Sequence, residues 1–131
     1  MSGFSNYTQN AVLNWLKGTT MPTAPAALYV ALFNGDPTDA GSGGTDVTTT
    51  VRTAGRVAAT FGAISGNTSI ANSADVDFGA AAGAATVSHF AIYDAATEGN
   101  MLGSAALASS QSVASTNLVK FATGALAINV G

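Results

Sequence analysis

Hydrophobic residues near the start of the chain recur at helical spacing. Tyr7, Ala11 and Trp15 are four residues apart, which places them on one side of an α-helix. A serine directly before this stretch can cap the helix, and Gly18 can end it. Two prolines follow within seven residues and cannot continue it. The pattern therefore predicts one short amphipathic helix over Ser5–Lys17.

Beyond the helix, the spacing of hydrophobic residues changes to that of β-strands. Ala26–Phe33 is short and continuously apolar, which is typical of a strand buried on both faces. Arg56–Phe61 alternates between larger and smaller or polar residues. The remaining predicted strands are Asn67–Asn72, Asp75–Phe78, Thr86–Tyr93, Met101–Leu107, Ser112–Val113, Leu118–Phe121 and Leu126–Val130.

Short strands separated by frequent turns predict an all-β fold. We expect a jelly-roll-like antiparallel β-sandwich of about eight strands with one short N-terminal α-helix. The pattern indicates a single domain over residues 1–131, with the helix at 5–17 and the sandwich at 26–130. Residues 38–50 are rich in Gly, Thr and Asp and are expected to form an exposed loop.

The composition provides few charged residues for the surface of this fold. Charged residues make up 8% of the 131 residues, against about 25% in a typical soluble domain. Ser, Thr, Asn, Gly and Ala must therefore supply the surface. Two interpretations fit: neighbours in an assembly cover much of it, or it is a neutral β surface with no particular partner.

Charge and residue types exclude several classes of function. The net charge is −3, and the four cations are scattered, so no basic patch is expected to bind nucleic acid directly. The absence of cysteine excludes disulfides, thiol catalysis and cysteine-based zinc sites. No apolar stretch is long enough to span a membrane, and no signal peptide is visible. We expect synthesis in a cytoplasm and no membrane partner.

The sequence contains no recognisable catalytic constellation. The only histidine, His89, lies within a predicted strand, on the same expected face as Val87 and Ala91. A packed or hydrogen-bonded strand histidine is the favoured interpretation over a catalytic base. Asp75 and Asp77 share a strand face opposite the apolar residues, which is typical of solvated positions. The chain is therefore predicted not to be an enzyme, with no catalytic residues.

One loop region offers oxygen ligands that could suit calcium. It contains Asp36 and Asp39, and Asp46 follows further on. The spacing of an EF-hand and its closing glutamate are both missing, and turn geometry explains Asn, Gly, Asp and Pro together. No metal ion and no other cofactor is therefore predicted. Trp15, the single tryptophan, could be either a core anchor or an interface anchor.

Five segments, taken together, resemble a known family. They are Ser5–Leu16, Leu28–Pro37, Gly55–Gly62, Val87–Leu102 and Phe121–Ile128. The chain resembles small virion proteins of tailed phages, known as tail fibre proteins and in several cases similar to capsid cement (decoration) proteins. The resemblance runs over nearly the whole chain, and Val87–Leu102 is its most specific part.

The resemblance implies a jelly-roll β-sandwich that binds other virion proteins. Two functions compete, and the compact chain without a shaft favours a capsid cement protein over a small tail or tail-fibre component for host attachment. As cement, it would form a homodimer or homotrimer on the outer surface of the capsid and bind an HK97-type major capsid protein. The expected interface residues lie in the helix, in the loop region and just after it: Tyr7, Leu13, Trp15, Asp36, Asp39, Asp46 and Arg52.

Overall fold

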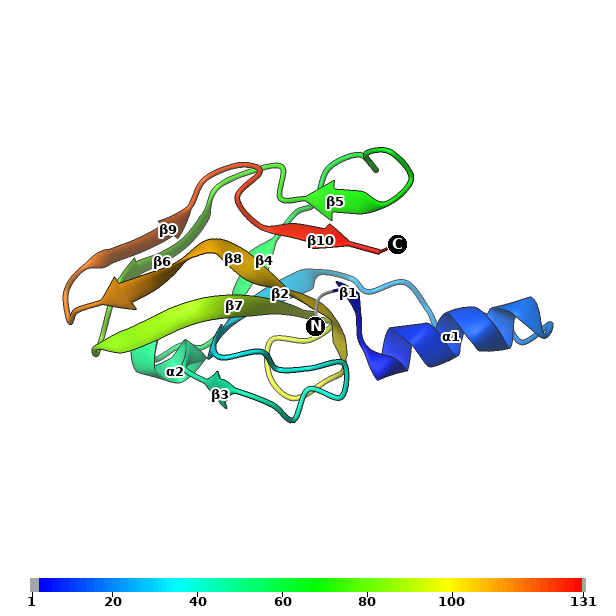
Figure 1. Ribbon diagram of the computed structural model, residues 1–131, viewed down its shortest axis with the longest axis horizontal. Coiled ribbons are helices and arrows are strands. Elements are labelled where there is room, and N and C mark those ends of the chain that lie inside the picture. The colour runs from blue at the N-terminus through cyan, green and yellow to red at the C-terminus, as the bar shows by residue number, and fades with distance from the viewer. Residues whose placement is uncertain (1–2, 131) are drawn as a thin grey trace.

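The chain folds into two layers of antiparallel strands, with one helix projecting from the side (Figure 1). The computed structural model describes residues 3–130. Its helices are α1 (Asn6–Leu16) and α2 (Thr48–Val51). Its strands are β1 (Gly3–Phe4), β2 (Leu28–Asn34), β3 (Thr45–Asp46), β4 (Val57–Ala59), β5 (Ser69–Ala71), β6 (Val76–Ala80), β7 (Ala85–Tyr93), β8 (Met101–Val113), β9 (Leu118–Phe121) and β10 (Ala127–Asn129).

The larger layer is a six-stranded sheet in the order β1-β8-β7-β2-β3, and β4 also pairs with β2. The smaller layer consists of two ribbons, β5 with β10 and β6 with β9. All of these pairs are antiparallel. The prediction of an all-β antiparallel sandwich with one N-terminal helix is confirmed. Two of the short strands, β1 and β3, were not expected.

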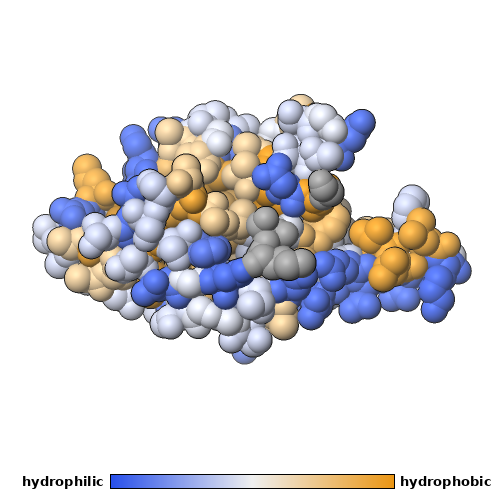
Figure 2. All heavy atoms as spheres, viewed as in Figure 1, coloured by the Kyte–Doolittle hydropathy of each residue, from blue (hydrophilic) through white to orange (hydrophobic). Residues whose placement is uncertain are grey.

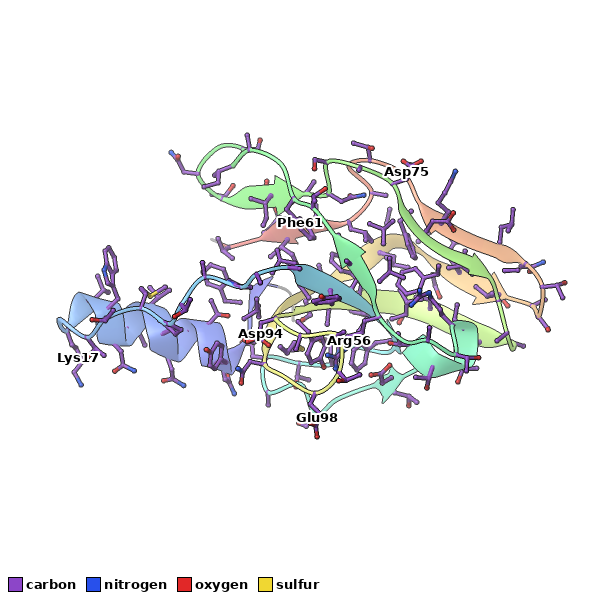
Figure 3. All side chains as sticks on the ribbon, turned by 180° about the vertical axis from the view of Figure 1, so that it is seen from behind. Lys17, Arg56, Phe61, Asp75, Asp94 and Glu98 are labelled. Atoms are coloured by element: carbon purple, nitrogen blue, oxygen red, sulfur yellow. The ribbon has the colours of Figure 1, made fainter. Side chains whose placement is uncertain are left out.

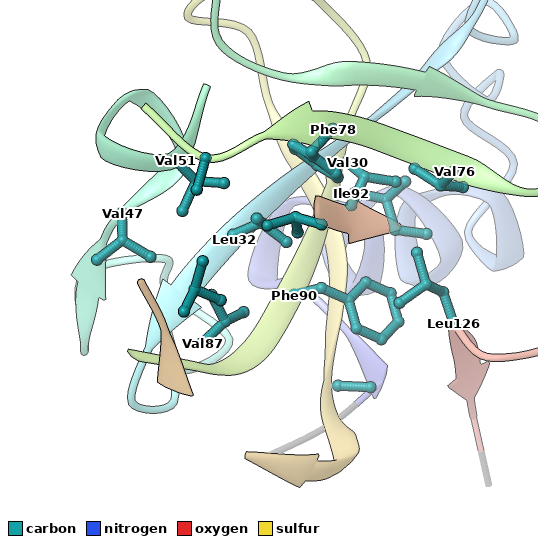
Figure 4. Close-up of a cluster of buried hydrophobic side chains, with 14 of the residues drawn as sticks. Val30, Leu32, Val47, Val51, Val76, Phe78, Val87, Phe90, Ile92 and Leu126 are labelled. Atoms are coloured by element: carbon teal, nitrogen blue, oxygen red, sulfur yellow. The ribbon is translucent and has the colours of Figure 1, made fainter. Parts of the chain in front are cut away.

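The main hydrophobic core lies between the two layers (Figure 4). Val30 and Leu32 of β2 and Phe90 and Ile92 of β7 are buried there. Because side chains alternate along a strand, the residues between them point to the opposite face of the sheet. The smaller layer covers the core with Val76 and Phe78 of β6, Val119 of β9, and Leu126 and Ile128 near the end of the chain.

A second, smaller hydrophobic cluster lies on the opposite face of the larger sheet, and Tyr93 packs against it. The guanidinium of Arg56 lies 3.6 Å from the centre of the Tyr93 ring, a cation–π contact. The same group donates to the carbonyl oxygens of Ala95 and Glu98, at 2.8 and 2.7 Å (Figure 3). Arg56 therefore fixes the loop between β7 and β8 against the sheet.

The segment expected as an exposed loop, residues 38–50, is only partly one. Its first half is largely exposed, but its second half forms β3 and part of α2. Val47 and Val51 are buried in the main core. The hydroxyl of Thr48 accepts a hydrogen bond from the N–H of Leu32 at 2.9 Å. This side chain therefore replaces a neighbouring strand for part of β2.

The length of β8 and its register with β7 also differ from the prediction. The two strands expected at Met101–Leu107 and Ser112–Val113 form the single strand β8. Its register with β7 shifts between Val87 and His89. As a result, Val87 belongs to the main core, whereas Ala91 belongs to the smaller cluster on the opposite face. His89 pairs with Phe33 of the smaller cluster, so the expectation that it shares a face with Val87 is wrong, because the alternation along β7 is interrupted where its register with β8 shifts.

Candidate assembly interface on the projecting helix

Among the described residues, the hydrogen bonds that attach the helix α1 to the sandwich come from its first turn. The backbone N–H of Ser5 and the hydroxyl of Thr8 both donate to the carbonyl oxygen of Leu102, at 3.0 and 2.7 Å. The N–H of Asn6 donates to the carbonyl oxygen of Asp39 at 2.8 Å. No side chain of α1 is buried. The rest of the helix therefore extends away from the sandwich (Figure 1).

Both ends of this helix have well-defined caps. The hydroxyl of Ser5 accepts a hydrogen bond from the N–H of Thr8 at 3.2 Å, as an N-cap does. At the other end, Gly18 has φ of +98° and its N–H donates to the carbonyl oxygen of Trp15. The N–H of Thr19 donates to the carbonyl oxygen of Asn14, which completes a Schellman motif. The projection is thus a defined structure that reverses the chain at Gly18.

The free end of α1 exposes large apolar side chains. Trp15 and Leu16 are 57% and 69% exposed, and Leu13 is also exposed. Figure 2 shows hydrophobic atoms gathered at this end of the molecule. An isolated helix of eleven residues is marginal in water, and apolar surface of this kind marks contact sites. We call Leu13, Trp15 and Leu16 the apolar tip.

A groove of about 510 Å³ lies between the base of α1 and the end of the sandwich. Its walls come from three places: Tyr7 and Ala11 of α1, the returning segment 21–25, and the strand ends. Most of its lining is apolar. Of the described lining residues, only Asp94 carries a charge. From the strands, the lining includes Leu28, Ile70, Ile92, Leu102 and Ile128. We call this feature the basal groove.

The structure brings only some of the predicted interface residues together. Tyr7, Leu13 and Trp15 lie on α1 and are all exposed, so Trp15 is not a core anchor. Asp39 lies at the base of the helix, where its carboxylate accepts a hydrogen bond from the side chain of Gln9 at 3.1 Å. This carboxylate therefore supports the attachment of α1.

The other three predicted residues form hydrogen bonds with the backbone of their own turns. The carboxylate of Asp36 accepts from the N–H of Thr38 at 2.8 Å, and that of Asp46 accepts from the N–H of Thr48 at 2.9 Å. Arg52 donates to nearby backbone carbonyl oxygens at 3.0 and 3.1 Å. Across residues 3–130, no three acidic, histidine or cysteine side chains form a group that could hold a metal ion.

The candidate chemical groups elsewhere also have local partners. Nδ1 of His89 lies 2.9 Å from the hydroxyl of Ser88, which also accepts a hydrogen bond from the N–H of Gly35 at 2.7 Å. Partial burial lowers the pKa of His89. Asp75 lies 3.7 Å from the amino group of Lys120 on the exposed surface. The hydrogen bond between Ser88 and His89 supports the strand-histidine interpretation.

Sequence reasoning missed the basal groove and part of the apolar tip. Leu16 is exposed at the tip, but a helical pattern alone does not show which of its apolar residues find a partner. The groove combines strand residues that are far apart in the sequence, such as Leu28 and Ile128. No local pattern could have shown that these residues meet.

The charge of the basal groove is stabilised by local hydrogen bonds. The carboxylate of Asp94 accepts from the N–H of Asn100 at 2.7 Å and from its side-chain amide at 3.1 Å. The backbone hydrogen bond is the main cause that holds the pKa of Asp94 below its ordinary value of 3.8, against an opposing effect of partial burial. The positive charge of Arg56 acts in the same direction as the hydrogen bonds. Asp94 is therefore ionised at neutral pH.

Replacing Asp94 with asparagine is expected to lower the Tm at pH 7. Because the folded pKa lies below the unfolded value, the stabilisation is fully present above pH 3.8 and is lost as the pH falls through the folded pKa. The difference in Tm between the two proteins should therefore shrink towards zero in acid. Thermal unfolding followed by circular dichroism at pH 7 and at steps below pH 4 measures it. A difference that is constant with pH would contradict this prediction.

A family model matches almost all of the described chain. It is described as podophage GP4 fiber I protein gp80, and it matches residues 3–129. The chain belongs to this family. It is accordingly a structural component of a phage particle. No curated protein matches the chain. Within residues 3–130, no helix is long and apolar enough to cross a membrane.

The family bears on the two functions that the sequence left open. Its description names a fibre, which supports a tail-fibre component better than a capsid cement protein. The resemblance to phage tail fibre proteins is confirmed. The preference for capsid cement is not confirmed.

Proposed function

We propose that this chain is a non-enzymatic building unit of a phage tail fibre and takes part in attachment to the host. The family match over residues 3–129 carries this proposal. The low charge of the chain is consistent with it, because surface buried between neighbouring subunits is depleted in charged residues.

The projecting helix supports a role in assembly. Its apolar tip has no partner within residues 3–130 that buries it. In a fibre, contacts between subunits would cover this surface, and many copies would multiply weak individual contacts. The protein would act as a homodimer or homotrimer, and the exposed part of the loop after β2 would be available for contact with a host receptor.

The location of the protein on intact particles tests this proposal. Gold-labelled antibody against the chain should mark fibres at the tail in electron micrographs. Label spread over the head would overturn the fibre function. That outcome would instead favour capsid cement on the outer surface of the head, with an HK97-type major capsid protein as partner. A phage that lacks the gene is the control for antibody specificity.

A further inference from the structure

We infer that the apolar tip of α1 binds in the basal groove of a second copy of this chain, so that two chains pair through a two-fold contact. The inference rests on the proposed role of α1 in assembly and names the partner that it binds. A two-fold contact needs both complementary surfaces on one chain, and this chain has both of them, at opposite ends of one helix.

The amount of apolar surface suits a pairing of two chains. Phe4, Tyr7 and Met21 of the basal groove and the three residues of the apolar tip are between 37% and 69% exposed. With about 200 Å² per large side chain, they leave roughly 600 Å² of surface open on each chain. A standard interface buries about 800 Å² per partner. The rest of the groove lining can supply the remainder.

The charges on the two surfaces are complementary. The helix α1 has no charged residue, and Lys17 follows directly at its free end. Asp94 is the charged residue in the lining of the groove. Figure 3 shows Lys17 and Asp94 at opposite ends of the helix. If two helices pack antiparallel, the free end of each lies beside the base of the other, so each Lys17 approaches the Asp94 of the second copy.

The length of the helix fits this arrangement. Eleven residues span about 16 Å, and both helices of a two-fold pair have the same length. When Trp15 enters the second copy's groove, the reverse contact therefore forms at the same time. An unrelated partner would need its own apolar surface and its own cation at this spacing. The second copy supplies both.

The oligomeric state of the full chain in solution tests the inference. Light scattering coupled to size exclusion should show a dimer for the wild type. The variant Trp15→Ser/Leu16→Ser should weaken the dimer about 100-fold or more, because buried aromatic residues dominate interface energies. Ile64→Ser and Leu118→Ser are matched controls, since these side chains are 70% and 82% exposed elsewhere. Both controls should remain dimeric.

Three outcomes would overturn the inference. They are a monomeric wild type at about 1 mM, a trimer, or a Trp15→Ser/Leu16→Ser variant that pairs as well as the wild type. Far-UV circular dichroism verifies that each variant is folded. None of these outcomes depends on where antibody marks the particle. Failure of this inference and failure of the fibre function are therefore distinguishable.

A charge reversal tests the orientation of the pair. Lys17→Glu should weaken the dimer about fivefold, because it places like charges together. Adding Asp94→Asn to this variant should restore part of the affinity, since the repulsion is then removed. Lys120→Glu is the control and should not change the affinity, because Lys120 lies near Asp75 instead. An unchanged affinity for Lys17→Glu would contradict the antiparallel arrangement.

Discussion

Replacing Asn72 with alanine should lower the free energy of unfolding by about 3 kcal/mol. The side chain of Asn72 is buried and donates to the carbonyl oxygens of Ala74 and Ala122, at 2.9 and 3.0 Å. Its oxygen accepts from the N–H of Leu126 at 2.9 Å. Leu126 is fully buried, so alanine would leave this N–H without an acceptor. A buried orphan donor costs about 1–3 kcal/mol, and the other lost bonds add to it.

Urea unfolding followed by far-UV circular dichroism measures this effect. Asn10→Ala is the matched control, because Asn10 is exposed on α1; it should change the free energy of unfolding by less than about 0.5 kcal/mol. Asn72→Asp should also destabilise the protein, because a carboxylate oxygen would face two carbonyl oxygens where the amide now donates. A loss below about 1 kcal/mol for Asn72→Ala would mean that another group satisfies the Leu126 N–H.

Replacing Phe90 with alanine should lower the free energy of unfolding by about 3–5 kcal/mol. Phe90 is fully buried at the centre of the larger sheet, directly opposite Leu32 of β2 and Ala105 of β8. The smaller layer of the sandwich covers the same core, so the surrounding strands cannot close the cavity without moving both layers. The cost therefore combines lost burial with an unfilled cavity.

The same unfolding experiment measures the effect of Phe90→Ala. Phe4→Ala is the control with the same chemical change, because Phe4 is 37% exposed beside the basal groove. It should cost much less than Phe90→Ala at a concentration where the chain is monomeric. Equal losses for the two variants would mean that Phe90 does not hold the two layers together.

Local signals made the elements of this fold predictable. Ser5 and Gly18 are the residue types that cap helices, and both occupy these positions in the structure. Alternation placed Val76 and Phe78 inward and Asp77 outward, as observed. The stretch Thr48–Val51 was missed because three threonines in a row have no helical periodicity. The register shift between Val87 and His89 could not be seen, because it depends on the pairing with β8.

The pairing of strands and the candidate interface could not be predicted in the same way. β1 pairs with β8, and β5 pairs with β10, and no residue pattern indicates these partners. The basal groove exists only because these distant strands end near α1. The residues of the apolar tip could be named as helical, but only the structure shows that the helix leaves the sandwich after its first turn.

The position of β2 in the larger sheet has a consequence during protein synthesis. This apolar strand pairs with β7, which follows roughly 60 residues later in the chain. At about 5–20 residues per second, a ribosome needs several seconds to complete that partner. During this time one edge of this hydrophobic strand stays unpaired in the nascent chain, which makes the chain prone to aggregate. The yield of soluble protein should therefore depend on how crowded the nascent chains are, and slower initiation of translation should increase it.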